Sequence, residues 1–182
     1  MTARIHVFGA AGSGCTTLGR ALAERLGCVN LDTDTYFWLP SDPPYQQMRE
    51  PAERRALLGA DLDQHDSWTL SGSLSGWGDI FVPRFDLVVF LWIPPEVRLA
   101  RLAEREVRLF GAEALASGGR MHEIHTTFMA WAAGYDTGDL SMRSRARHEL
   151  WLQSIPCPVV RLEGAGTVDE HVREVMRHVE RG

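Results

Sequence analysis

The chain has 182 residues, of which 45% are hydrophobic and 24% are charged, and this is enough for one domain with a sizeable core. Its net charge of −5 argues against a general surface for nucleic acid or for an anionic membrane. The longest apolar run, LVVFLWIPP, is too short to span a bilayer, and the three cysteines show neither metal-site nor disulfide spacing. We therefore expect a single cytoplasmic domain over residues 1–182, either monomeric or homodimeric.

All 19 basic residues are arginine, because the chain contains no lysine. The simplest explanation is a compositional bias of the source genome. Whatever its origin, any cation that this chain places on a phosphate has to be an arginine.

Strand-like apolar runs alternate with amphipathic helical patterns along the chain. The predicted strands cover residues 4–8, 29–31, 68–71, 87–93 and 159–162. The predicted helices cover residues 16–26, 53–65, 94–110, 122–135, 141–153 and 167–179, and Thr167 and Glu170 fit a capping box. Residues 111–121 are small and glycine-rich, and we expect a mobile connection there. The alternation predicts a mainly parallel α/β sheet with ligands at the carboxyl ends of its strands.

The stretch GAAGSGCTT lies between the first strand and the first helix and resembles GxxxxGK[ST] with Cys15 in place of the lysine. Glycines in such a loop let backbone N–H groups turn toward phosphate oxygens at a helix N-terminus. A ligand-free tight turn is the less favoured alternative. The predicted nucleotide-binding residues are Gly9, Ala10, Gly12, Ser13, Gly14, Cys15, Thr16 and Thr17.

Cys15 has two interpretations. A thiol at a helix N-terminus tends to have a lowered pKa, which would make it reactive or redox-sensing. A thiolate would repel phosphate, however, so we favour a neutral thiol that has lost the function of the lysine.

Asp32 and Asp34 follow the second predicted strand, two residues apart, so an extended segment would point both carboxylates the same way. Such a pair can hold Mg²⁺ through water and accept a proton from a hydroxyl group. Aspartates that cap a turn are the alternative. The neighbouring glycine loop favours the functional interpretation, with Thr16 and Asp32 as the metal-binding residues.

Two groups of arginines flank the glycine-rich connection. The spacing of Arg98, Arg101, Arg105 and Arg108 places them on one helical face, where they would form either a solvated surface or a site for phosphates. The segment MRSRAR adds Arg143, Arg145 and Arg147. We interpret the two groups as parts of a lid that closes over phosphates.

The glycine-rich segment WTLSGSLSGWGD follows the third predicted strand. Ser71 and Ser73 could donate hydrogen bonds to a substrate there, or the segment could be a plain turn. Aromatic residues in the loop after the second predicted strand could line an acceptor pocket or belong to the core.

Four segments together resemble the nucleoside monophosphate kinase and shikimate kinase group of P-loop phosphotransferases. They are GAAGSGCTTLGRALAERLG, LDTD, FDLVVFLWIPPEVRLARLAER and RLEGAGTVDEHVREV. The resemblance implies a three-layer P-loop fold with a five-stranded parallel sheet in the order 2-3-1-4-5. It further implies an acceptor segment at about 36–66, a helical lid at about 108–142, and a base-contacting loop that includes Gly164 and Gly166.

The resemblance implies an ATP- or NTP-dependent kinase that uses Mg²⁺ and acts on a small-molecule or nucleotide acceptor. The residues expected to carry the reaction are Asp32, Asp34, Arg101, Arg105, Arg143 and Arg145. The chain departs from the group in its loop lysine, in the SGS that ends the third strand, and in its acceptor loop. A nucleotide-binding module with little catalysis and a simple NTP hydrolase remain the alternative interpretations.

Overall fold

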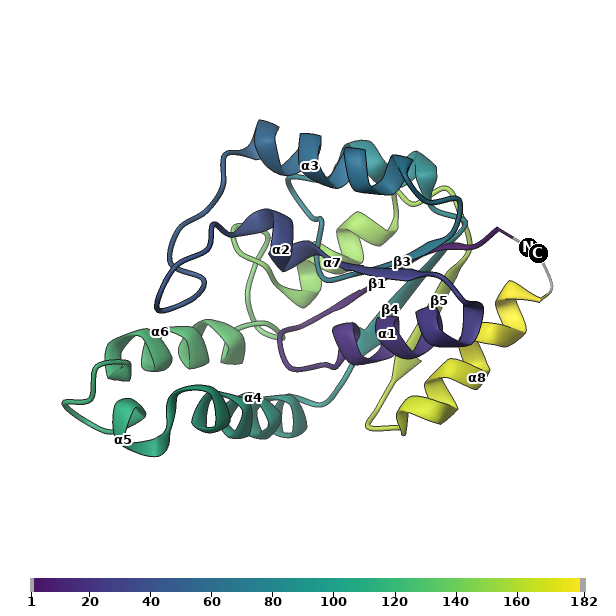
Figure 1. The fold of residues 1–182 in the computed structure, drawn as a ribbon. Coiled ribbons are helices and arrows are strands. Elements are labelled where there is room, and N and C mark those ends of the chain that lie inside the picture. Colours follow the sequence, from purple (N-terminus) through teal and green to yellow (C-terminus); the bar gives the residue numbers. More distant parts are fainter. Residues whose placement is uncertain (1, 181–182) are drawn as a thin grey trace.

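A computed structural model describes residues 2–180 and contains a five-stranded sheet with helices on both faces (Figure 1). All strands pair in parallel in the order β2-β3-β1-β4-β5, as the resemblance implied. The strands are β1 (Arg4–Gly9), β2 (Val29–Asp32), β3 (Trp68–Ser71), β4 (Leu87–Trp92) and β5 (Val159–Glu163). The order places β1 at the centre, so the loop that follows it opens at the middle of the carboxyl edge.

The helices lie close to the predicted positions, with three additions. These are the short helices α2 and α5 and the 3₁₀ segment η1 (Asp79–Arg84), none of which the sequence patterns predicted. The α-helices are α1 (Cys15–Leu26), α2 (Thr33–Phe37), α3 (Pro51–Asp63), α4 (Pro95–Phe110), α5 (Ala112–Leu115), α6 (His122–Ala133), α7 (Arg145–Leu152) and α8 (Val168–Val179). None of the helices within residues 2–180 is long and apolar enough to cross a membrane.

The core has two layers because successive side chains of each strand point to opposite faces. In β1, Ile5 and Val7 join the cluster that packs against α1 and α8. Phe8 joins the other cluster, which packs against α3 and α7. The predicted three-layer arrangement is confirmed, and the central strands are buried on both faces, as expected for a parallel sheet.

A close approach between α1 and the sheet fixes the direction of the first helix. A Cβ on Gly19 would collide with the Ser71 hydroxyl, and the Thr69 hydroxyl donates a hydrogen bond of 2.9 Å to the Gly19 carbonyl oxygen. Ser71 is fully buried and donates to the Asn30 side chain, so it serves packing rather than the substrate contact considered above. The contact packs α1 directly against β3.

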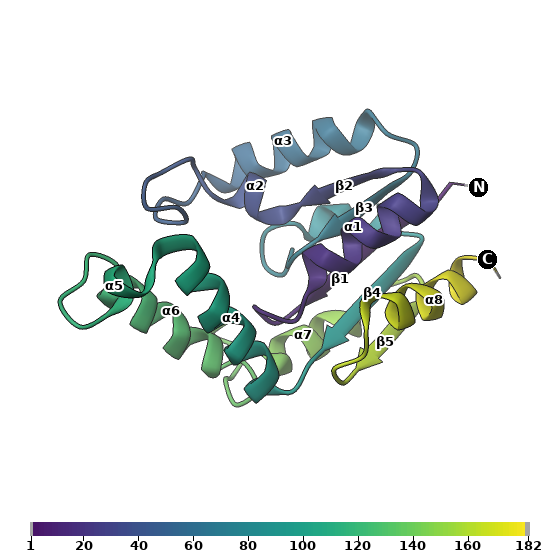
Figure 2. The ribbon, with the colours of Figure 1, turned by 60° about the horizontal axis from the view of Figure 1, so that its bottom comes forward.

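The helices α4, α5 and α6 form an arm that projects beyond the carboxyl edge of the sheet (Figures 1 and 2). The segment joining α2 to α3 projects on the same side in both views. The arm includes most of the lid expected at residues 108–142, and the short helix α5 lies within residues 111–121, the predicted mobile connection. The end of β1 therefore opens between the two projections.

Candidate active site

The glycine loop after β1 has the backbone that anion binding requires. Gly12 and Gly14 have φ angles of 80° and 97°, which side-chain-bearing residues rarely adopt. The Ser13 hydroxyl closes the loop by donating a hydrogen bond of 2.8 Å to the Ala10 carbonyl oxygen. Gly14 is the N-cap of α1, and no side chain caps the first N–H groups of this helix. Those N–H groups and the positive end of the helix dipole are therefore free for an anion.

Cys15 is the first residue of α1, and its sulfur lies 3.2 Å from the Ser13 hydroxyl oxygen. Burial raises the pKa of the Cys15 thiol to about 11, although the Ser13 hydrogen bond and the Arg143 cation oppose the rise. The thiol is therefore neutral at pH 7. This favours the neutral-thiol interpretation over a reactive thiolate.

The structure brings Thr16 and Asp32 together, although they belong to different elements. The Thr16 hydroxyl donates a hydrogen bond of 2.9 Å to Asp32 Oδ2. Asp32 Oδ1 accepts a bond of 3.0 Å from the Asp34 N–H and so caps α2. The expectation of an extended segment is thus wrong, because helix α2 begins directly after Asp32 and includes Asp34. Asp32 therefore caps a turn, as the alternative interpretation proposed, and it also keeps its hydrogen bond with Thr16.

Asp34 lies in a field of mixed charge. Asp34 is exposed to solvent, yet partial desolvation by the surrounding protein and the neighbouring Asp32 carboxylate raise the pKa of its carboxyl. The Arg143 and Arg105 cations and a hydrogen bond from Trp38 oppose this rise. A carboxylate that binds protons more readily than usual, beside a phosphate loop, is suited to accept a proton from a hydroxyl group.

Arg143 reaches the glycine loop from the segment between α6 and α7. Its Nη2 donates a hydrogen bond of 2.8 Å to the Gly9 carbonyl oxygen, across 134 residues of sequence. Its guanidinium also lies over the Trp131 ring, 5.8 Å from the centroid. Of the predicted arginines, Arg143 is the one that the structure places against the loop itself.

The other arginines occupy different surroundings. Arg98 is fully buried and pairs with Asp136 at 2.7 Å, so it belongs neither to a solvated face nor to a phosphate site. Arg105 is 3.4 Å from Glu106, and its charge also acts on Asp34. The arginines expected to form one row on α4 therefore have different roles: Arg98 packs in the interior, and Arg105 lies near the candidate site.

Arg101 and Arg145 have other neighbours. The charge of Arg101 acts on His171 in α8, which follows the loop containing Gly164 and Gly166. Arg145 lies 4.8 Å above the Trp92 ring, near Glu149. A Cβ on Gly166 would lie 2.7 Å from His171 Nε2, so His171 packs closely against this loop.

A buried set of hydrogen-bonded side chains around His148 was not predicted from the sequence. His148 accepts or donates hydrogen bonds at both ring nitrogens, 3.1 Å from the Ser73 hydroxyl and 2.8 Å from the Tyr135 hydroxyl. Burial lowers the pKa of His148 to about 3, so the ring is neutral. The i,i+4 spacing of Ser144, His148 and Leu152 marks the buried face of α7 and could have revealed it.

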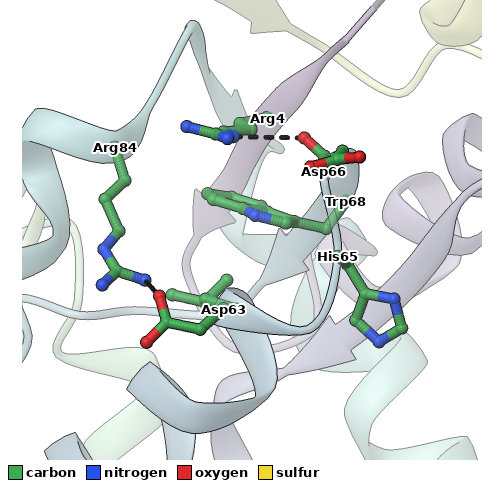
Figure 3. Close-up of a pocket in the computed structure, with 7 residues that line it drawn as sticks. Arg4, Asp63, His65, Asp66, Trp68 and Arg84 are labelled. Atoms are coloured by element: carbon green, nitrogen blue, oxygen red, sulfur yellow. Dashed lines mark hydrogen bonds and ion pairs between the residues drawn. The ribbon is translucent and has the colours of Figure 1, made fainter.

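A pocket of about 160 Å³ lies at the opposite end of the sheet (Figure 3). Arg4 and Trp68 begin their strands there, and Arg84 pairs with Asp63 at 2.7 Å across the opening. Because ligands of parallel sheets bind at the carboxyl ends, this pocket is separate from the site around the glycine loop. Within residues 2–180, no group of three or more His, Cys, Asp or Glu side chains forms a metal site.

Comparison with known proteins agrees with this geometry. The family described as AAA domain matches residues 5–112, which run from β1 to the end of α4 and include the glycine loop. The chain is 46% identical to the uncharacterized protein YqaC of Bacillus subtilis over 98% of each chain. It is 31% identical to the cytidylate kinase of Archaeoglobus fulgidus over 57% of this chain and 62% of that one. The chain thus matches less than two thirds of the length of that kinase.

A solved shikimate kinase from Bacteroides thetaiotaomicron superposes with a TM-score of 0.58 at 20% identity, over 98% of both chains. An identity this low demonstrates a common fold alone. Together with the family match, it connects the sheet order, the glycine loop and the helical arm to the kinase-like P-loop fold. The chain belongs to the AAA domain family.

Proposed function

We propose that the chain transfers a phosphoryl group from Mg·ATP to a small acceptor. The observation that carries this proposal is the 2.9 Å hydrogen bond between Thr16 and Asp32. It joins the first turn of the helix after the glycine loop to the end of β2, two residues before Asp34. A structural turn alone has no need for a hydroxyl, a carboxylate and uncapped N–H groups at one place.

The donor set at this point fits a magnesium ion. A hydroxyl oxygen and a carboxylate oxygen are hard ligands, and Mg²⁺ usually binds one or two carboxylates together with phosphate oxygens and water. Thr16 and Asp32 would hold the ion, which would neutralise phosphate charge when bound. The small number of protein ligands suits an ion that arrives with its nucleotide.

The remaining residues have distinct parts in the proposed reaction. The loop N–H groups bind the phosphates, and Asp34 accepts the proton of the acceptor hydroxyl as that oxygen bonds to the γ-phosphorus and ADP departs. Arg105 and Arg143 offset the charge of the phosphoryl group, because both act on the surroundings of Asp34. Arg101 would act near the nucleotide base. Arg145 would have to move away from the Trp92 ring before it could contact the phosphoryl group.

A panel of acceptors tests the proposal. ADP release from Mg·ATP is measured with nucleoside monophosphates, sugars and hydroxy acids, for the wild type and for Asp34→Asn. We expect one acceptor class to accelerate ADP release, and Asp34→Asn to slow it by about 10²–10⁴-fold while nucleotide affinity is kept. Asp66→Asn is the matched control, since Asp66 is exposed at the opposite end of the sheet.

One observation favours a second function. The neutral Cys15 removes a cation that supports catalysis in the P-loop pattern, so a nucleotide-binding module would also suit the loop. Mg·ATP binding with no ADP release would support that alternative. ADP release that no acceptor accelerates would support an NTP hydrolase. An unchanged rate in Asp34→Asn would contradict the assigned role of Asp34.

A further inference from the structure

We propose that Arg143 takes the place of the missing P-loop lysine and contacts the terminal phosphates of the bound nucleotide. The inference rests on the proposed function, because it concerns the same nucleotide site. It assigns the cation of the loop to a residue that is 128 positions away from Cys15 in the sequence.

The first argument is position. Arg143 Nη2 lies 2.8 Å from the carbonyl oxygen of Gly9, and a Cβ on Gly9 would lie 3.3 Å from the sulfur of Cys15. The charge of the guanidinium also acts on the Cys15 thiol, so the two side chains lie near one another at the loop. Because the Cys15 side chain is short and neutral, Arg143 is the cation next to the glycine loop. A lysine at position 15 would add a second cation to this loop.

The second argument is charge. Arg98, Arg105 and Arg145 each have a carboxylate within 4.0 Å. Among the described residues, Arg143 forms no ion pair; the same holds for Arg101, Arg108 and Arg147, but of these Arg143 is the one that bonds to Gly9. Its Nε is buried and has no hydrogen-bond partner. A cation that is partly removed from water with no carboxylate in direct contact is costly, and an anionic ligand would offset that cost.

The third argument is that Arg143 is held in place. The Ser144 hydroxyl, which is fully buried, donates 2.6 Å to the Asp139 carbonyl oxygen, and the Arg145 N–H donates 2.7 Å to the Tyr135 carbonyl oxygen. Both bonds fix the backbone next to Arg143. The segment joining α6 to α7 passes beside the end of β1 in both views (Figures 1 and 2). The guanidinium is thus prepared for the phosphates and needs no lid movement to arrive.

The experiment moves the cation from position 143 to position 15. Calorimetric titration with Mg·ATP, and separately with magnesium tripolyphosphate, is made on the wild type, Arg143→Gln, Cys15→Lys and the double variant. Tripolyphosphate is included because a contact to phosphate alone predicts the same loss for both ligands. Arg177→Gln is the matched control, since Arg177 is exposed on α8 and pairs only with Glu174. Thermal unfolding confirms that each variant is folded.

We expect Arg143→Gln to weaken both ligands by about 10- to 100-fold, the effect of losing a charged hydrogen bond. Cys15→Lys alone should bind no better than the wild type, because two cations then occupy one place. The double variant should regain most of the wild-type affinity, which a merely structural role of Arg143 would not produce.

Three outcomes would overturn the inference. They are unchanged affinity in Arg143→Gln, tighter binding by Cys15→Lys alone, and no recovery in the folded double variant. These leave the proposed function standing as long as the wild type binds Mg·ATP. Wild-type protein that binds neither ligand would instead refute the proposed function itself.

Discussion

The buried pair of Arg98 and Asp136 offers the sharpest test of how the arm is fastened to the sheet. Arg98 is 0% exposed and Asp136 is 17% exposed, with 2.7 Å between the paired atoms. Arg98 also donates 2.6 Å to the Ala132 carbonyl oxygen, and Asp136 accepts 2.8 Å from the Trp92 indole. The pair therefore connects α4, the end of α6 and β4. The perturbation is Asp136→Ala, which leaves the arginine buried and unpaired.

The cost follows from the burial of the arginine. Removing one partner of a buried ion pair costs about 3–5 kcal/mol, and the partial exposure of Asp136 favours the lower end. The orphaned Trp92 N–H adds about 1 kcal/mol. We therefore expect a loss of about 3–4 kcal/mol in the free energy of unfolding. For a chain of this size it corresponds to a fall in Tm of about 6–16 °C.

The assay is urea unfolding followed by circular dichroism on Asp136→Ala, Arg98→Met and the double variant. Arg98→Met should cost less than Asp136→Ala, because the remaining aspartate can reach water and the remaining arginine cannot. The double variant should be close to Arg98→Met alone, since replacing both charges removes the uncompensated one. A cost below about 1 kcal/mol for Asp136→Ala, or strictly additive costs, would refute the reasoning.

Three further outcomes are expected. Thr16→Val should lower the ratio of ATP affinities with and without magnesium by about tenfold or more, whereas Thr16→Ser should keep this ratio. Titration with and without EDTA measures the two affinities. Gly9→Ala should destabilise the fold by about 1–3 kcal/mol in urea unfolding, because its Cβ would collide with the Leu91 carbonyl oxygen. Burial lowers the pKa of both His6 and His148 to about 3, so the unfolded chain takes up protons below pH 6.5 and the folded chain does not. Stability should therefore fall by about 2 kcal/mol per histidine between pH 7 and pH 5, and His148→Gln should remove about half of the fall.

The elements that depend on local sequence were predicted well. The capping box of Thr167 and Glu170 is present, because both of its hydrogen bonds lie within one helical turn. The glycine loop has the expected backbone because its spacing permits few other conformations. The sheet order came from the resemblance to known kinases, since periodicity alone does not determine which strands are neighbours.

The errors have physical causes. The arginine row on α4 was read from helical spacing, which gives the face of a side chain but not its partner. Arg98 is buried because Asp136, 38 residues later, neutralises it. Helix α2 was missed because five residues are too few for a periodic pattern. No sequence pattern near Arg143 or Gly9 predicts their contact, because only folding brings the two residues together.

The position of the loop cation has a consequence for the whole arm. In the GxxxxGK[ST] pattern the lysine belongs to the loop, so its charge is present whenever the loop is folded. If Arg143 carries that charge, it depends on the segment between α6 and α7, and that segment is fixed from two sides. Asp136 holds it to Arg98 in α4, and Tyr135 connects it through His148 to Ser73 beyond β3. Nucleotide binding would then be coupled to the acceptor side of the sheet through packed groups rather than through the loop itself. Loss of the lysine would thus make phosphate affinity depend on the arrangement of the arm.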